Sequence, residues 1–138
     1  MTDFLRYDEG AKYLLTSGDG LPATCYFLLS TKPCSGAGSH VVGDTLAGGV
    51  GEITGTGYAR QSQAAPTPSS VGAVAFSQMS FATGSATDWP NSVKSVVLAT
   101  TVNNTGKAIC AWNLQTGGTA RDLSQANTTE LVTPTVSL

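Results

Sequence analysis

Charged side chains are scarce in this sequence. Asp, Glu, Lys and Arg make up 12% of its 138 residues, about half of the roughly 25% that is usual in soluble domains. The seven basic residues stand singly, and the formal net charge is −2. Proteins that bind nucleic-acid phosphates or anionic lipids normally carry a cluster of Lys and Arg. We therefore expect no nucleic acid and no membrane among the partners.

Long apolar runs are missing as well. No stretch reaches the roughly 18 consecutive apolar residues that a helix needs to span a bilayer. The first residues, Met1-Thr2-Asp3, are followed by Asp8 and Glu9. They lack the basic start and the apolar segment of a secretory signal. This pattern predicts synthesis in a cytoplasm.

The residue types that carry most enzyme and metal chemistry are few. His40 is the only histidine, and its glycine-rich surroundings predict a solvated loop residue, because a catalytic Ser–His pair also needs an orienting group and an oxyanion hole. The three cysteines form no Cys-x-x-Cys motif, whereas a structural zinc site needs about four Cys or His ligands. The glycines at 48–57 lack the Gly-Lys-Ser/Thr of a phosphate loop. We therefore expect no catalytic, metal-binding or cofactor-binding residue, and no enzyme.

Two cysteines, Cys25 and Cys110, lie inside apolar runs. Thiols in such runs are usually small core residues, so we expect them to be buried and unpaired. Trp89 stands in a loop-like sequence at 88–91. If exposed it would be an interface anchor, and if buried it would cap one end of the fold. Trp112 alternates with apolar residues, which predicts a core position.

Apolar spacing predicts one helix, over residues 3–15. Phe4, Tyr7, Ala11 and Leu14 recur with the period of a helix face, although a central glycine weakens the helix. Turn-forming residues follow it at 16–22. The remaining sequence predicts short strands between turn residues. The expected strands are residues 24–31, 56–63, 71–82, 93–102, 107–114 and 130–138.

Two of these predictions are more detailed. Residues 93–102 and 107–114 are joined by Asn and Gly turn chemistry, which predicts an antiparallel hairpin. Within 71–82 the large side chains change parity midway. That change predicts a β-bulge or a strand that is buried on both faces.

Residues 32–55 differ from the rest because they are rich in glycine and hold few large side chains. Fixing such a chain costs about 1–2 kcal/mol per residue in backbone entropy. Long loops in compact domains are usually functional or disordered. We therefore expect a loop that is mobile in the isolated protein and ordered only against a partner.

Together these elements predict a single domain, residues 1–138, of mainly β class. Its core would be a small antiparallel β-sandwich or barrel of about six strands with one N-terminal helix. The strand at 24–31 and the region 56–138 would form that core. Short strands leave edges that need covering, which predicts self-association, with a trimer as the expected oligomer.

One segment also resembles a known family. Gly55-Thr56-Gly57-Tyr58-Ala59-Arg60-Gln61 is similar to the G-G-x-Y-A-R-Q/V signature of small virion proteins of tailed bacteriophages. The order of the strand at 26–30, the glycine-rich segment, the Tyr-Ala-Arg strand, the strand at 93–98 and the strand at 108–114 is also similar. The sequence departs from the family in its long glycine-rich loop and in Ser95, where the family would have a histidine.

The resemblance implies assembly rather than catalysis. It implies a virion structural protein, first of all a head decoration protein that binds the major capsid protein on the outside of the capsid lattice. A tail, fibre or adaptor component that binds other virion proteins is the alternative. The Tyr-Ala-Arg strand would be structural, with the Arg60 guanidinium stacked on or hydrogen-bonded to neighbouring strands. From another class, a small carbohydrate-binding β module remains open, because Trp89 and the tyrosines could stack on a sugar.

Overall fold

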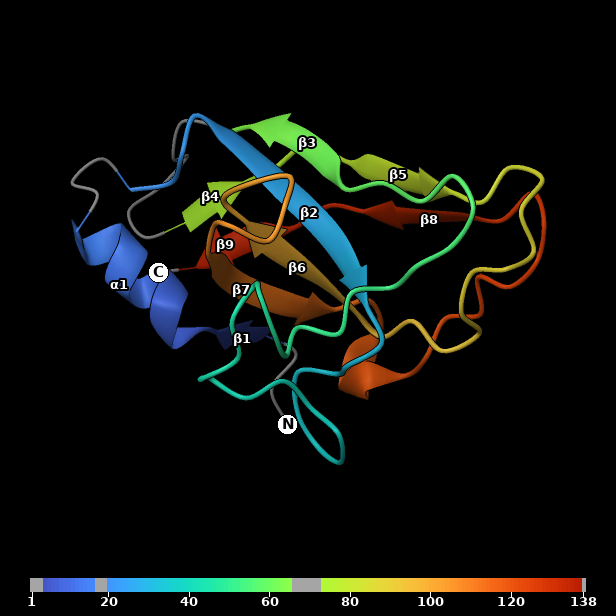
Figure 1. Ribbon diagram of the computed structural model, residues 1–138, viewed down its shortest axis with the longest axis horizontal. Coiled ribbons are helices and arrows are strands. Elements are labelled where there is room, and N and C mark those ends of the chain that lie inside the picture. Colours follow the sequence, from blue (N-terminus) through green and yellow to red (C-terminus); the bar gives the residue numbers. More distant parts are fainter. Residues whose placement is uncertain (1–3, 17–19, 66–72, 138) are drawn as a thin grey trace.

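The computed structural model describes residues 4–16, 20–65 and 73–137 (Figure 1). Within these residues the chain forms one α-helix, nine short strands and one 3-10 turn at Thr116–Gly118. The elements are β1 (Phe4–Arg6), α1 (Asp8–Thr16), β2 (Thr24–Ser30), β3 (Gln61–Ala64), β4 (Ala73–Ala75), β5 (Met79–Ala82), β6 (Ser95–Ala99), β7 (Ala108–Asn113), β8 (Thr129–Val132) and β9 (Thr135–Ser137).

A five-stranded antiparallel sheet in the order β1-β7-β6-β2-β3 forms the centre of the molecule. Two antiparallel pairs, β4–β9 and β5–β8, complete the strands. The mainly β, antiparallel class with one N-terminal helix is therefore confirmed. Among the described residues the strands do not close into a barrel, so of the two architectures the open, layered one is present.

One face of the central sheet packs on the two strand pairs. Alternate residues of β2 and β6, such as Phe27 and Leu98, are paired in register and point to this side. They meet Phe76 and Phe81, and the rings of Phe27 and Phe76 lie edge to face with centroids 4.9 Å apart. The period-2 alternation of the strands thus gives the first hydrophobic core.

The opposite face of the sheet is covered by residues 32–55, which we call the covering segment. Leu28 and Val97 point to this side, and Leu46 and Val50 of the covering segment pack on them in a second core. In Figure 1 the covering segment is the irregular cyan-to-green chain in front of the sheet. It is irregular, as expected, but Leu46, Val50 and Ile53 of this segment belong to the domain's own cores and need no partner for burial.

The predicted hairpin is confirmed. β6 pairs with β7 in the register Ser95↔Asn113 to Leu98↔Cys110, with an irregularity after Leu98. The strand predicted at 24–31 is present as β2.

Other element boundaries were wrong. The predicted helix 3–15 begins only at Asp8, because residues 4–6 form β1 and pair with β7. Residues 71–82 form two strands with different partners, which explains their change of parity; Val71 and Gly72 lie outside the described residues. The strand predicted at 56–63 begins at Gln61. The one predicted at 130–138 is interrupted between β8 and β9, and Leu138 lies outside the described residues.

Candidate functional site

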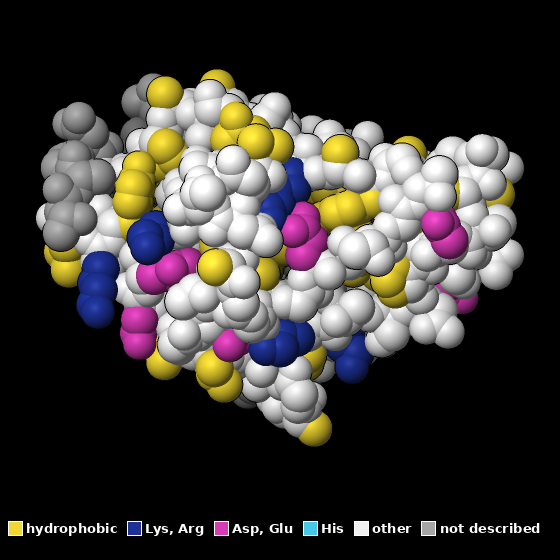
Figure 2. Space-filling view, viewed as in Figure 1, with side chains coloured by type: hydrophobic (Ala, Val, Ile, Leu, Met, Phe, Trp, Pro, Cys, Tyr) yellow, Lys and Arg dark blue, Asp and Glu magenta, His cyan; other side chains and the backbone are white. Residues whose placement is uncertain are grey.

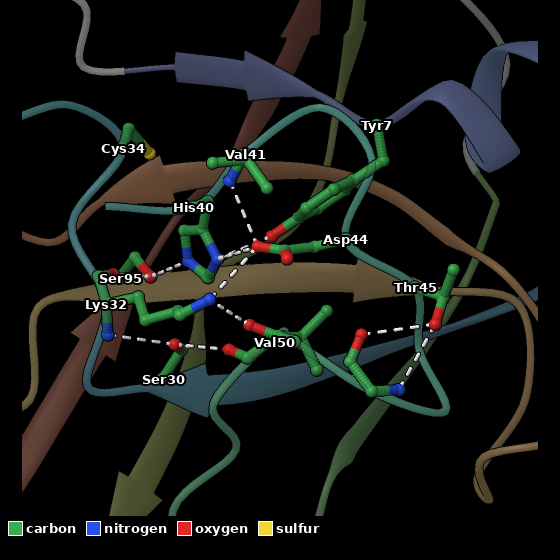
Figure 3. Close-up of polar contacts among 12 residues, drawn as sticks. Tyr7, Ser30, Lys32, Cys34, His40, Val41, Asp44, Thr45, Val50 and Ser95 are labelled. Carbon is green, nitrogen blue, oxygen red and sulfur yellow. Dashed lines mark hydrogen bonds and ion pairs between the residues drawn. The ribbon is translucent and has the colours of Figure 1, made fainter. Parts of the chain in front are cut away.

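Three side chains from distant parts of the chain meet beneath the covering segment (Figure 3). Tyr7 lies between β1 and α1, His40 belongs to the covering segment, and Ser95 is the first residue of β6. The Tyr7 hydroxyl lies 2.9 Å from His40 Nδ1, and His40 Nε2 lies 2.9 Å from Ser95 Oγ. Tyr7 and Ser95 are 0% exposed and His40 is 2% exposed. We call this group the polar bridge.

The hydrogen bonds define where the protons of the polar bridge lie. Ser95 Oγ donates to the carbonyl oxygen of Lys32 at 2.6 Å, so the bond between Ser95 and His40 is donated by His40 Nε2–H. His40 Nδ1 then accepts from the Tyr7 hydroxyl, and the imidazole is neutral. Burial, assisted by the Lys32 charge and opposed by Asp44, lowers the pKa of His40 to about 4. Burial also raises the pKa of Tyr7 well above its ordinary range.

This arrangement has the opposite polarity to a catalytic Ser–His pair. In a nucleophilic serine the imidazole accepts the proton of the hydroxyl, whereas Ser95 directs its proton to a backbone carbonyl. Both side chains are also closed off from any substrate by burial. The polar bridge therefore joins parts of the fold: its neutral hydrogen bonds link the covering segment to β6 and to the β1–α1 junction.

Further polar contacts hold the covering segment beside the polar bridge. Lys32 Nζ lies 3.1 Å from Asp44 Oδ2 and also donates to the Gly49 carbonyl oxygen. Asp44 Oδ2 accepts from the backbone N–H of Val41 at 3.0 Å. Ser30 Oγ donates to the carbonyl oxygen of Val50 at 2.6 Å. These bonds give an irregular segment defined partners for its backbone, which buried chain requires.

The prediction that His40 is a solvated loop residue was therefore wrong. Its partners are 33 and 55 residues away in sequence, so the composition around His40 could not predict them. A usable signal was present in the strands. Ser30 ends β2 and Ser95 begins β6, so that two polar residues adjoin apolar strands and face each other in the β2–β6 register. Buried hydroxyls of this kind need hydrogen-bond partners.

The segment that carries the family resemblance forms a second polar cluster. Arg60 contacts Glu52 through Nε at 2.9 Å and through Nη2 at 2.6 Å. Its Nη1 donates to the carbonyl oxygens of Thr101 and Asn103, and Nη2 also donates to Asn104 Oδ1. All five guanidinium protons thus have protein acceptors, and the side chain is 5% exposed. We call this cluster the Arg60 clamp.

Tyr58 also binds Glu52, the carboxylate of the Arg60 clamp. Its hydroxyl donates to Glu52 Oε1 at 3.0 Å and accepts from the backbone N–H of Leu29, also at 3.0 Å. Burial, followed by the nearby Glu52 charge, raises the pKa of Tyr58 above its ordinary range. Arg60 does form hydrogen bonds, but to Glu52 and to the turn at 101–104 and not to neighbouring strands as expected, and Tyr58 and Arg60 themselves precede β3.

Trp89 is 3% exposed and belongs to the first core. Its indole N–H donates to the Thr56 carbonyl oxygen at 2.8 Å, and its ring lies edge to face with Tyr58 at 5.5 Å. A Cβ at Gly55 would collide with this indole. The interpretation of Trp89 as an exposed anchor is wrong, and the buried interpretation is confirmed.

An open hollow of about 580 Å³ lies beside the Arg60 clamp, with Val102, Asn103 and Asn104 on its rim. Figure 2 shows the face that carries the covering segment, where charged side chains lie singly or in small groups among uncharged polar surface. No basic patch gathers on this face. The hollow therefore offers amide and apolar groups to a ligand more than free charge.

The thiols lie in the cores as expected. Cys25 and Cys110, the two for which burial was expected, are buried and form no disulfide, and Cys34 is buried as well. Burial raises the pKa of Cys25 to about 11 and that of Cys110 well above its ordinary value. Across residues 4–16, 20–65 and 73–137, no three His, Cys, Asp or Glu side chains are grouped so that they could hold a metal ion. In the same residues no helix has both the length and the apolar character to cross a bilayer.

Comparison with known proteins gives no relative. No family model matches the sequence, no curated protein is similar to it, and no solved structure matches the fold.

Proposed function

We propose that this chain is a non-enzymatic structural protein of a tailed-bacteriophage virion. Within that class we propose a head decoration protein that binds the major capsid protein from outside the lattice. The observation that carries the proposal is that Tyr58 and Arg60 form structural hydrogen bonds inside the protein. The residues that resemble the virion signature fasten the covering segment to the sheet, and their polar groups are bonded within the protein.

The surface of the molecule supports a role in protein contacts. The central sheet ends in two short strands, β1 and β3, and strand edges readily pair with other chains. The covering segment also presents two neighbouring valines, Val41 and Val42, which are 56% and 53% exposed. Their turn is held by Asp44 and by a bond from the Asp8 N–H to the Val42 carbonyl oxygen. A fixed apolar projection on a surface of low charge suits contact with another protein.

Quantitative mass spectrometry of purified particles that carry this chain tests the proposal. A decoration protein should be present in a copy number comparable with that of the major capsid protein. A few copies per particle would favour the tail, fibre or adaptor alternative. Absence from washed particles would refute a virion role of either kind.

Light scattering of the purified chain tests the expected self-association, for which a trimer is our proposal. A monomer with no affinity for capsids would contradict both the oligomer and the decoration role. The carbohydrate-binding alternative rests on the amide-rimmed hollow beside the Arg60 clamp. Selective binding on a glycan array, lost in Asn104→Ala, would favour it.

A further inference from the structure

We propose that the covering segment is an acid-sensitive flap: protonation of His40 breaks the polar bridge and releases residues 33–50 from the face of β2, β6 and β7. The released face would expose Leu28 and Val97 of the second core. The proposal concerns a conformational change in this chain and does not require the virion role.

The position of His40 makes it the central link. It joins the covering segment to the β1–α1 junction through Tyr7 and to the central strand β6 through Ser95. The neighbouring contacts go to other parts of the fold. The Lys32–Asp44 pair lies within the segment and its base. Bonds from the Asp8 N–H to the Val42 carbonyl oxygen and from the Leu46 N–H to Glu9 hold the segment to the helix side of the domain and not to β6. Release of the His40 ring therefore removes the side-chain tie between the middle of the segment and β6.

The hydrogen-bond pattern favours a neutral imidazole in the closed state. A proton on Nδ1 would force the Tyr7 hydroxyl to turn, to accept, and to give up the bond that it now donates to that nitrogen, while Nε2 already carries a proton toward Ser95. The new charge would also be buried, and an uncompensated buried charge is costly. Opening the segment places the imidazolium in water and removes this cost.

The charged groups around His40 have opposite effects on the pKa of its imidazole. Lys32, at the base of the segment, disfavours the imidazolium, and Asp44, whose Oδ2 lies 4.0 Å from Nδ1, favours it. From the helix side, Glu9 lies near Tyr7, and its Oε1 accepts from the backbone N–H of Leu46 at 2.8 Å. Desolvation is the largest influence on His40 and determines the direction.

Linkage gives the size of the effect. An opened His40 would titrate at its ordinary pKa of 6.5, compared with about 4 in the closed state. The opening equilibrium should therefore be roughly 20-fold larger at pH 5 than at pH 7. Carboxylates in general titrate near pH ~4, so this interval isolates the histidine.

Hydrogen exchange at pH 5 and pH 7, corrected for intrinsic rates, tests the flap. The amides of His40 and Asp44, which bond within the covering segment, should be less protected than those of β2 and β6 at both pH values. Their protection should fall roughly 20-fold at pH 5. Equal protection of the segment and the strands would overturn the proposal, because release would then occur only with global unfolding.

Two variants assign the effect to the imidazole. His40→Gln retains an acceptor and a donor but does not titrate, so the loss of protection at pH 5 should disappear. Val41→Ala, at an exposed neighbouring position, should behave as the wild type. A loss of protection in His40→Gln equal to the wild type would overturn the proposal. If His40→Gln does not fold, NMR of the single histidine in the wild type decides, and titration near its ordinary value in the folded protein would refute the closed state described here.

Discussion

Replacing Arg60 tests whether the segment that resembles the virion signature stabilises the fold. Arg60→Ala would remove five hydrogen bonds, two to the Glu52 carboxylate and three to the turn at 101–104. Removing one partner of a buried ion pair costs about 3–5 kcal/mol. Because Glu52 is partly exposed and keeps the Tyr58 hydroxyl as a donor, we expect about 3 kcal/mol.

Urea denaturation followed by tryptophan fluorescence measures this loss. With a slope of roughly 1.5 kcal/mol per molar, the midpoint should fall by about 2 M. Arg60→Lys separates geometry from charge, because one ammonium cannot reach both Glu52 and the turn carbonyls. We expect it to recover less than half of the stability lost in Arg60→Ala.

Lys107→Ala is the matched control. Lys107 lies 3.8 Å from Glu9, and its side chain is half exposed, so the pair should contribute at most about 1 kcal/mol. The reasoning would be refuted if Arg60→Ala lay within about 1 kcal/mol of the wild type. It would also fail if Arg60→Lys were as stable as the wild type, because the fork geometry would then be irrelevant.

Three further predictions concern other parts of the fold. Gly10→Ala should lower the free energy of unfolding by about 2 kcal/mol, although alanine has the better helix propensity, because the new Cβ would lie 2.5 Å from the β7 backbone. Thermal denaturation measures this loss. Leu15→Ala, at an 85% exposed site of α1, is the control and should change the stability little. Cys25 and Cys110 should react slowly with a thiol reagent at neutral pH and rapidly in denaturant; fast native labelling of both would contradict their burial. The pKa of His40 is lowered from 6.5 to about 4 in the folded protein. The free energy of unfolding should therefore fall by about 3 kcal/mol as the pH falls through that interval. Urea midpoints that do not change between these pH values would contradict this prediction.

The features that sequence predicted well are those with local causes. The β6–β7 hairpin follows from alternating apolar residues on both sides of an Asn- and Gly-containing turn, and all of these lie within one short stretch. The same holds for β2, whose aromatic and aliphatic run sits between turn residues. The burial of Cys25 and Cys110 followed from the apolar character of β2 and β7, the strands that contain them.

The errors occurred where distant residues decide the local structure. Phe4 and Tyr7 fit a helix period, but the open edge of β7 offers backbone partners, and the Phe4 ring packs on Trp112 with centroids 5.6 Å apart. Tertiary pairing thus outweighs a weak helical preference in three residues. The split of 71–82 has the same cause, since its two halves pair with strands near the C-terminus.

The packing of the covering segment could not be predicted from composition alone. Its few apolar side chains include Leu46 and Val50, which pack on the second core, on the sheet face that carries Leu28 and Val97. Its backbone is fixed by side-chain groups outside it, among them Ser30 Oγ and Glu9 Oε1. The entropy cost of ordering glycine-rich chain is therefore offset by partners that no local window contains.

The two polar clusters make the covering segment different from an ordinary layer of a sandwich. A strand layer is held by a regular backbone ladder, whereas this layer is held largely by separate bonds that involve side chains, among them those of the polar bridge and the Arg60 clamp. The two ties differ in chemistry. The guanidinium of the clamp stays charged at any ordinary pH, and the imidazole of the bridge does not. Acid should therefore loosen the middle of the segment while its end at Glu52 stays bound to Arg60, so that the segment would open as a flap hinged at the clamp.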